Sequence, residues 1–266
     1  MSSREGLLLP EPVPNRHRST PSSIKKCSRY LTRILRFNQM DFEFAAWQMI
    51  YLFTSPQKVF KNSVYRKQTK NQYARDDPAF LVLLAACIIL SAAALSIVLH
   101  LNIFSFIKFT FWLVFVDCIF LGAIVATLAW ILTNKFLKKD ALSSEDVEWG
   151  YAFDIHLNAF FPPLIILHIV QLLFFSYFIS QDWFVSRLFG NTLWLIAVIY
   201  YCYITYLGYR SLPYLKDTRF ILYALVPTFL FYLIALCAGL NIMRMIMNFY
   251  EYRVNWRWGT VRWVTV

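Results

Sequence analysis

Long runs of apolar residues, separated by short polar stretches, dominate the pattern along this chain. Five runs have about the 20 residues that a helix rising about 1.5 Å per residue needs to cross a hydrocarbon core of about 30 Å. They are Ala79–Leu101, Phe109–Leu132, Ala159–Ile179, Leu188–Leu207 and Phe220–Met243. Because the bilayer core offers no water to backbone polar groups, each run must form a helix. The pattern predicts an all-α polytopic membrane protein with five transmembrane helices.

The regions outside these runs divide the rest of the chain. Residues 1–27 are rich in Pro, Ser and Arg without apolar periodicity, which predicts a disordered tail. Residues 28–77 mix basic and apolar positions at helical spacing, which predicts amphipathic helices at the bilayer surface. Within them, Asp41–Phe53 is apolar almost all round, but its 13 residues are too few to span. We therefore expect a transmembrane domain over 78–243, followed by a tail over 244–266.

The basic residues are distributed unevenly, and this predicts the orientation. Of the 26 Lys and Arg, twenty lie in residues 1–77 and in the second and fourth loops between the runs, and six lie on the other side. Loops rich in Lys and Arg stay in the cytosol. We therefore expect a cytosolic N-terminus and a lumenal tail.

Three polar residues inside the runs are candidates for a function in the membrane. Asp117 is the one charged residue in the five runs, and His168 and Gln171 share a face of the third run. Counted from the cytosolic ends, Asp117 lies about 22 Å deep, Gln171 about 18 Å and His168 about 13 Å, so we expect Asp117 to pair with Gln171. An ion or proton passage is one interpretation. The favoured interpretation is a structural hydrogen bond of a protonated Asp117, since transporters usually have more polar groups and broken helices.

The sequence does not support catalysis. It contains no nucleophile–base pair, no Gly-rich phosphate loop and no paired acids, and its five cysteines lack metal-site or disulfide spacing. We expect no catalytic, cofactor-binding or metal-binding residues.

A docking patch for a partner or for lipid is predicted before the first span. A helix of about 13 residues cannot bury all of its aromatic side chains unless bilayer, spans or a partner covers them. A group of basic residues follows directly. The candidate docking residues are Phe42, Phe44, Trp47, Tyr51, Lys58, Lys61, Arg66 and Lys67. The interleaved aromatics Tyr30, Phe37, Tyr65 and Tyr73 would also suit RNA.

Several long and unusual runs resemble one known family. They are Arg36–Gln57, Tyr65–Lys70, Ala74–Leu84, Asp146–Asp154, His156–Phe160 and Gly190–Trp194. On these runs the chain closely resembles the Unc-fifty (uncoordinated-fifty) family of Golgi membrane proteins, over residues 28–253. The final residues, 255–266, depart from the family pattern.

The resemblance implies a five-span protein of the Golgi and early secretory pathway with a cytosolic N-terminus. Family members are associated with cell-surface delivery of nicotinic acetylcholine receptors and with membrane recruitment of a Golgi Arf guanine-nucleotide exchange factor. Some are described as RNA-binding proteins of the inner nuclear membrane. We therefore expect a non-enzymatic trafficking factor whose partners are membrane lipids, the exchange factor and receptor subunits as cargo. The alternatives are an RNA-binding protein of the inner nuclear membrane, with an ER location also open, and a channel or transporter that uses Asp117.

Overall fold

The computed structural model describes Thr32, residues 36–139 and residues 145–255, and in these residues the regular structure is helical, without strands. Five helices are long and apolar enough to cross a membrane: Ala79–Val98, Ile103–Phe136, Trp149–Ile179, Phe184–Arg210 and Thr218–Cys237. The predicted all-α architecture with five spans is confirmed. The tail predicted over 1–27 lies outside the described residues.

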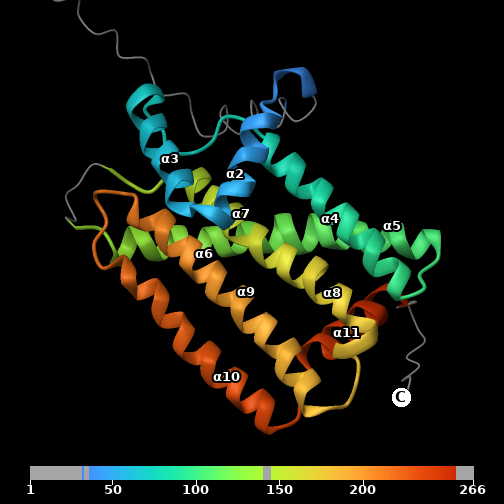
Figure 1. The fold of residues 1–266 in the computed structure, drawn as a ribbon. Helices are drawn as coiled ribbons and strands as arrows, with labels where there is room; N and C mark the ends of the chain where they lie inside the picture. Colours follow the sequence, from blue (N-terminus) through green and yellow to red (C-terminus); the bar gives the residue numbers. More distant parts are fainter. Residues whose placement is uncertain (1–31, 33–35, 140–144, 256–266) are drawn as a thin grey trace, which may run out of the picture.

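Most of the spans are composite helices (Figure 1). The first span is α4 (Ala79–Val98) and the fourth is α9 (Phe184–Arg210). The second consists of α5 (Ile103–Phe111), the π-helical η2 (Trp112–Phe120) and α6 (Leu121–Phe136). The third consists of α7 (Trp149–Ile165), the π-helical η3 (Ile166–Val170), α8 (Gln171–Phe174) and the π-helical η4 (Phe175–Ile179). The fifth consists of the 3₁₀ helix η5 (Thr218–Ala224) and α10 (Leu225–Cys237).

The third span begins ten residues earlier than predicted, at Trp149 rather than Ala159. The apolar run missed this part of the helix because Asp154 and Asn158 interrupt it. Both side chains are buried against protein, where hydrogen bonds satisfy them. Apolarity therefore marks the lipid-facing part of a span, and α7 continues beyond that part.

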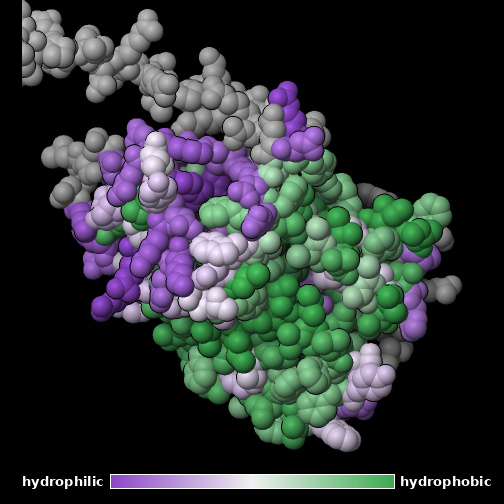
Figure 2. Space-filling model, turned by 45° about the horizontal axis from the view of Figure 1, so that its top comes forward, coloured by the Kyte–Doolittle hydropathy of each residue, from purple (hydrophilic) through white to green (hydrophobic). Residues whose placement is uncertain are grey.

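Two further helices form a hairpin at one end of the bundle, α2 (Phe42–Thr54) and α3 (Pro56–Lys70). The Asp41 side chain caps α2 by accepting a hydrogen bond from the Phe44 amide at 2.9 Å, and Pro56 occupies the first turn of α3. Figure 2 shows hydrophilic residues gathered around this hairpin and hydrophobic residues over most of the rest of the visible face. We call the end that carries α2 and α3 the basic end, and the opposite end the far end.

The described residues after the fifth span, up to Asn255, form a further helix. The chain turns at Gly239, where φ is +69°, and forms α11 (Ile242–Asn255). This helix packs against α5 and α9 across the far end of the bundle (Figure 1). The fifth span therefore ends at Cys237, before the predicted Met243, because a left-handed turn at glycine breaks the helix inside the apolar run.

Helix α7 lies in the centre of the bundle, between α6 and α9. Glycines on both neighbours allow this close approach. A Cβ atom at Gly208 of α9 would lie 2.7 Å from Ile155 Cγ1, and one at Gly122 of α6 would lie 2.6 Å from His156 Nε2. Small residues are the usual means of bringing membrane helices together.

Candidate functional site

The exposed side of α2 carries large apolar side chains. Phe44, Trp47 and Ile50 are 42%, 36% and 63% exposed, respectively. The rings of Phe44 and Trp47 stack with their centroids 5.9 Å apart, and Trp47 contacts Tyr51 at 4.0 Å. Their side chains form a continuous aromatic surface along the hairpin.

The first basic residues of α3 continue this surface. The Lys58 ammonium lies 4.9 Å from the centroid of the Tyr51 ring, which is a cation–π distance. Lys61 is exposed one turn further along α3. We call Phe44, Trp47, Ile50, Tyr51, Lys58 and Lys61 the aromatic–basic face.

The other predicted docking residues lie elsewhere. Arg66 is half-buried and donates to the Ser63 hydroxyl at 2.9 Å. Lys67 comes nine residues after Lys58, which is half a turn around a helix of 3.6 residues per turn. Its ammonium lies 3.7 Å from a Glu145 carboxylate oxygen. Phe42 is half-buried against the core. The structure therefore brings together five of the eight predicted docking residues and directs the other three toward the protein.

Hydrogen bonds fix the hairpin to the bundle. The Tyr200 hydroxyl of α9 donates to the Leu52 carbonyl at 3.1 Å, and Gln57 Nε2 donates to the Tyr203 hydroxyl at 3.3 Å. The Asp41 amide donates to an Asp77 carboxylate oxygen at 2.8 Å. The aromatic–basic face is thus held at a defined place relative to the spans.

Two carboxylates hold the segment between α3 and α4. One belongs to Glu148, the residue before the third span, and the other to Asp154 within that span. Glu148 accepts hydrogen bonds from the backbone amides of Tyr73 and Ala74, and Asp154 accepts one from the Arg75 amide at 2.6 Å. The Arg75 guanidinium donates to Asn158. Burial, followed by the nearby Glu145 and Glu148 carboxylates, raises the pKa of the Tyr73 phenol, which therefore stays neutral.

Within the membrane, Asp117 pairs with a residue that sequence reasoning assigned to the tail. Arg253 of α11 donates two hydrogen bonds to its carboxylate, at 2.6 and 2.8 Å. This two-bond geometry is typical of an ionised carboxylate with a guanidinium. The Arg253 guanidinium also lies 4.7 Å from the centroid of the Trp112 ring.

The predicted pairing of Asp117 with Gln171 is wrong. Gln171 Nε2 donates to the Gly190 carbonyl at 3.1 Å, and His168 Nδ1 lies 3.1 Å from the Ser91 hydroxyl. The depth count compared only residues inside the apolar runs, so it excluded Arg253. The signal that could have found this residue is the regular spacing of apolar and aromatic positions over 242–254, which is typical of a helix.

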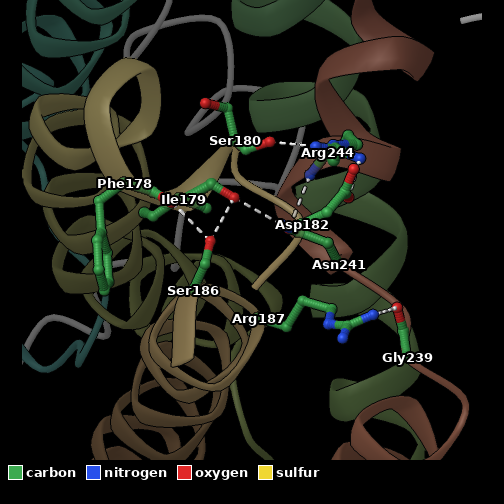
Figure 3. Close-up of polar contacts among 9 residues, drawn as sticks. All are labelled: Phe178, Ile179, Ser180, Asp182, Ser186, Arg187, Gly239, Asn241 and Arg244. Atoms are coloured by element: carbon green, nitrogen blue, oxygen red, sulfur yellow. Dashed lines mark hydrogen bonds and ion pairs between the residues drawn. The ribbon is translucent and has the colours of Figure 1, made fainter. Parts of the chain in front are cut away.

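A polar network at the far end joins the third and fourth spans to α11 (Figure 3). The Ile179 carbonyl accepts from Asn241 Nδ2 at 2.7 Å and from the Ser186 hydroxyl at 2.9 Å. Arg187 donates to the Gly239 carbonyl at 3.1 Å. Arg244 pairs with Asp182 at 2.6 Å and also donates to the Ser180 carbonyl. These contacts satisfy the carbonyls where helices end, so the network is structural.

Sequence comparisons agree with the predicted resemblance. The family model described as UNC-50 family matches residues 30–251. A curated relative from Drosophila melanogaster, "Protein unc-50 homolog", is 54% identical over 254 residues, which cover 95% of this chain and 92% of the relative. The Homo sapiens protein of the same name is 54% identical over 85% of this chain and 87% of its own length. The Danio rerio protein is 48% identical over 93% of this chain and 100% of its own length. No solved structure matches the chain.

Proposed function

This chain belongs to the UNC-50 family, and on that premise we propose that it is a non-enzymatic trafficking factor of Golgi and early secretory membranes. Its N-terminus and basic end face the cytosol. There it recruits an Arf guanine-nucleotide exchange factor, and it supports the delivery of nicotinic acetylcholine receptors to the cell surface. The aromatic–basic face is the docking surface for the exchange factor.

The observation that carries this proposal is the position of exposed aromatic residues on a fixed helix at the polar end of the molecule. Aromatic side chains such as Trp47 supply much of the binding energy in protein interfaces. An apolar surface beside charged residues also marks a place where a partner or a membrane surface binds. The face combines both, because Lys58 continues the row of Phe44, Trp47 and Tyr51 rings.

Charge supports a cytosolic basic end. The described cations of the far end all contact the protein itself: Arg187 with a carbonyl, Lys108 with the Val254 carbonyl, and Arg244 and Arg253 with carboxylates. At the basic end, Lys58 and Lys61 remain exposed. The side with more Lys and Arg is the cytosolic side.

The two alternatives receive less support from the geometry. Among the aromatics that would suit RNA, Phe37 and Tyr65 are exposed, but Tyr73 is only 4% exposed and cannot stack on a base. Asp117, the residue that a channel would use, has both carboxylate oxygens bound by Arg253.

The experiment replaces the basic residues of the face. In cells that lack the endogenous protein, the double variant Lys58→Glu, Lys61→Glu should recruit less exchange factor to the Golgi and deliver fewer nicotinic receptors to the surface. The matched control is Lys216→Glu, Arg219→Glu, which reverses two exposed charges at the same end, away from the aromatic–basic face. Abundance and location of both variants are measured in parallel.

Comparing the two variants distinguishes docking at the aromatic–basic face from a general effect of the charge at the basic end. If both lose recruitment equally, the total charge of the basic end matters and the face is not the docking site. Normal recruitment by the Lys58, Lys61 variant at normal abundance would move the docking site to another surface.

A further inference from the structure

A cavity of about 290 Å³ lies inside the group of spans. Residues of α4, η2, α7, η3, α9 and α11 line it, and its walls are mostly apolar side chains such as Leu113, Leu164 and Leu167. We propose that this cavity binds a sterol through the sterol hydroxyl group. This proposal concerns the interior of the bundle and is independent of the aromatic–basic face.

One unused hydrogen-bond donor lines the cavity. The Trp194 indole Nε1 is buried and has no hydrogen-bond partner among the described residues. A buried N–H group without a partner costs about 1–3 kcal/mol. Trp194 forms part of the cavity wall, and a ligand oxygen that reached this buried N–H group from the cavity would remove the cost.

One unused acceptor lines the cavity as well. The Ser91 hydroxyl donates to the Ile88 carbonyl at 2.8 Å, so its oxygen is left to accept the hydrogen of His168 Nδ1 at 3.1 Å. In a neutral imidazole the other nitrogen, Nε2, is then an acceptor. His168 lines the cavity, and among the described residues no hydrogen bond to this nitrogen is found. A hydroxyl group both accepts and donates, so it matches the Trp194 donor together with the His168 acceptor.

The charges around the cavity exclude an ionised ligand. Asp117 lines the cavity, but its carboxylate is neutralised by the two hydrogen bonds from Arg253. No Lys or Arg occurs among the lining residues to meet a phosphate or carboxylate. Burying an unpaired charge in such surroundings would cost far more than burying a hydroxyl group. The ligand is therefore neutral and mostly apolar, and a sterol, which has one hydroxyl group and no ester, fits this description.

The size of the cavity indicates which part of a sterol it can hold, and α11 forms one of its walls. Sites for drug-sized ligands have volumes of about 300–1,000 Å³, so this cavity holds the hydroxyl-bearing rings and leaves the tail of the sterol between the helices. Tyr250 of α11 lines the cavity and makes ring contacts with Phe109 at 5.3 Å and His168 at 6.4 Å. Helix α11 therefore forms one wall of the site.

The test measures labelling of the full-length protein in lipid nanodiscs by a photoreactive, clickable cholesterol. We expect saturable labelling on peptides that line the cavity, competed by cholesterol and poorly competed by cholesterol methyl ether, which cannot donate a hydrogen bond. Trp194→Phe keeps most of the ring and removes the donor. It should weaken the apparent affinity about 2- to 10-fold, the effect of one hydrogen bond. Trp183→Phe, at an exposed Trp just before the same helix, is the control and should not change the affinity.

A second variant tests whether labelling depends on the volume of the cavity. Ala197→Leu adds volume at a buried residue of the cavity wall and should reduce labelling without removing a polar group. The proposal is overturned if labelling does not saturate, if it maps outside the cavity, or if Trp194→Phe and Trp183→Phe bind equally well. Equal labelling by a photoreactive diacylglycerol would also overturn it, because the site would then not select a sterol.

Discussion

The pair of Asp117 and Arg253 connects two parts of the chain that are 136 residues apart. Both side chains are largely shielded, with 23% and 14% of their surface exposed. Charges inside a membrane protein are tolerated when they are paired, and removing one partner leaves the other without compensation. The sequence identified Asp117 as an unusual residue because of its charge. It did not identify Arg253, because an arginine beyond the last apolar run resembles the many others that face water.

We predict that Asp117→Asn is destabilising, although the side chain keeps its shape. The amide can still accept from Arg253, but the guanidinium charge is then unpaired. The expected loss is about 1–3 kcal/mol, below the value for fully buried pairs because both groups are partly exposed. The double variant Asp117→Asn, Arg253→Gln should lose less than the sum of the two single changes. Thermal melting of the detergent-solubilised protein measures these effects, and additive losses would show that the pair is not coupled.

Asp117→Lys is a stronger test of the same contact. It places a second cation against Arg253 in a poorly hydrated environment, and like charges at this distance repel. We expect misfolding and loss of the protein from its normal compartment, seen as reduced abundance and retention early in the secretory pathway. A variant that accumulates at normal levels would contradict the ion pair.

At the scale of elements, the sequence predicted which segments span and erred at their ends. The runs are long and apolar because lipid covers them, and lipid exposure is what hydropathy detects. One face of the beginning of α7 and one face of α11 pack against protein, so buried polar residues such as Asp154 and Asn241 occur in or beside them. Spacing along the chain can indicate such a helix, but it does not indicate which distant segment the helix contacts. The docking residues show the same limit. The pattern predicted a helix at α2, but the contacts of Arg66 with Ser63 and of Lys67 with Glu145 depend on the folded structure.

The contact of α7 with α9 depends on the absence of a side chain at Gly208. A Cβ atom there would lie within 3.0 Å of three Ile155 atoms. We predict that Gly208→Ala destabilises the bundle by about 1–3 kcal/mol through overpacking. Combining it with Ile155→Ala should recover part of the loss by making room for the methyl group. Ile199→Val, at an exposed residue of the same helix, is the control. The measurement is the melting temperature of the unmodified protein, Gly208→Ala, the double variant and the Ile199→Val control. No recovery in the double variant would exclude a steric cause.

Helix α11 is held in place by Asn191 of α9. Its side chain donates to the Leu240 carbonyl at 2.9 Å and accepts from the Ile242 amide at 3.0 Å. We predict that Asn191→Ala loosens α11, because two backbone groups lose their partner. Hydrogen exchange should become faster over 242–255 and stay unchanged over α2 and α3. Equal acceleration in both regions would indicate general unfolding instead.

For the whole molecule, the charge asymmetry in the sequence corresponds to a structural division. The hairpin of α2 and α3 lies at one end of the five spans, and α11 lies at the other. Counting charges alone gave the four described far-end cations the same weight as exposed lysines. The structure pairs two of these four, Arg244 and Arg253, with carboxylates, so the net positive charge of the far end is smaller than a count of its Lys and Arg gives. Both observations favour a cytosolic basic end.

N-glycosylation tests this orientation directly, because the sequence contains no Asn-x-Ser/Thr site. Attachment occurs only in the lumen and produces a shift in gel mobility that a glycosidase reverses. An acceptor site appended through a linker after Val266 should be glycosylated, since an odd number of spans places the two ends of the transmembrane domain on opposite sides. Leu142→Asn creates an acceptor with Ser144 in the loop between the second and third spans, and it should remain unmodified. Modification of the loop site instead of the appended one would invert the topology, and the aromatic–basic face would then be lumenal and unable to meet a cytosolic exchange factor.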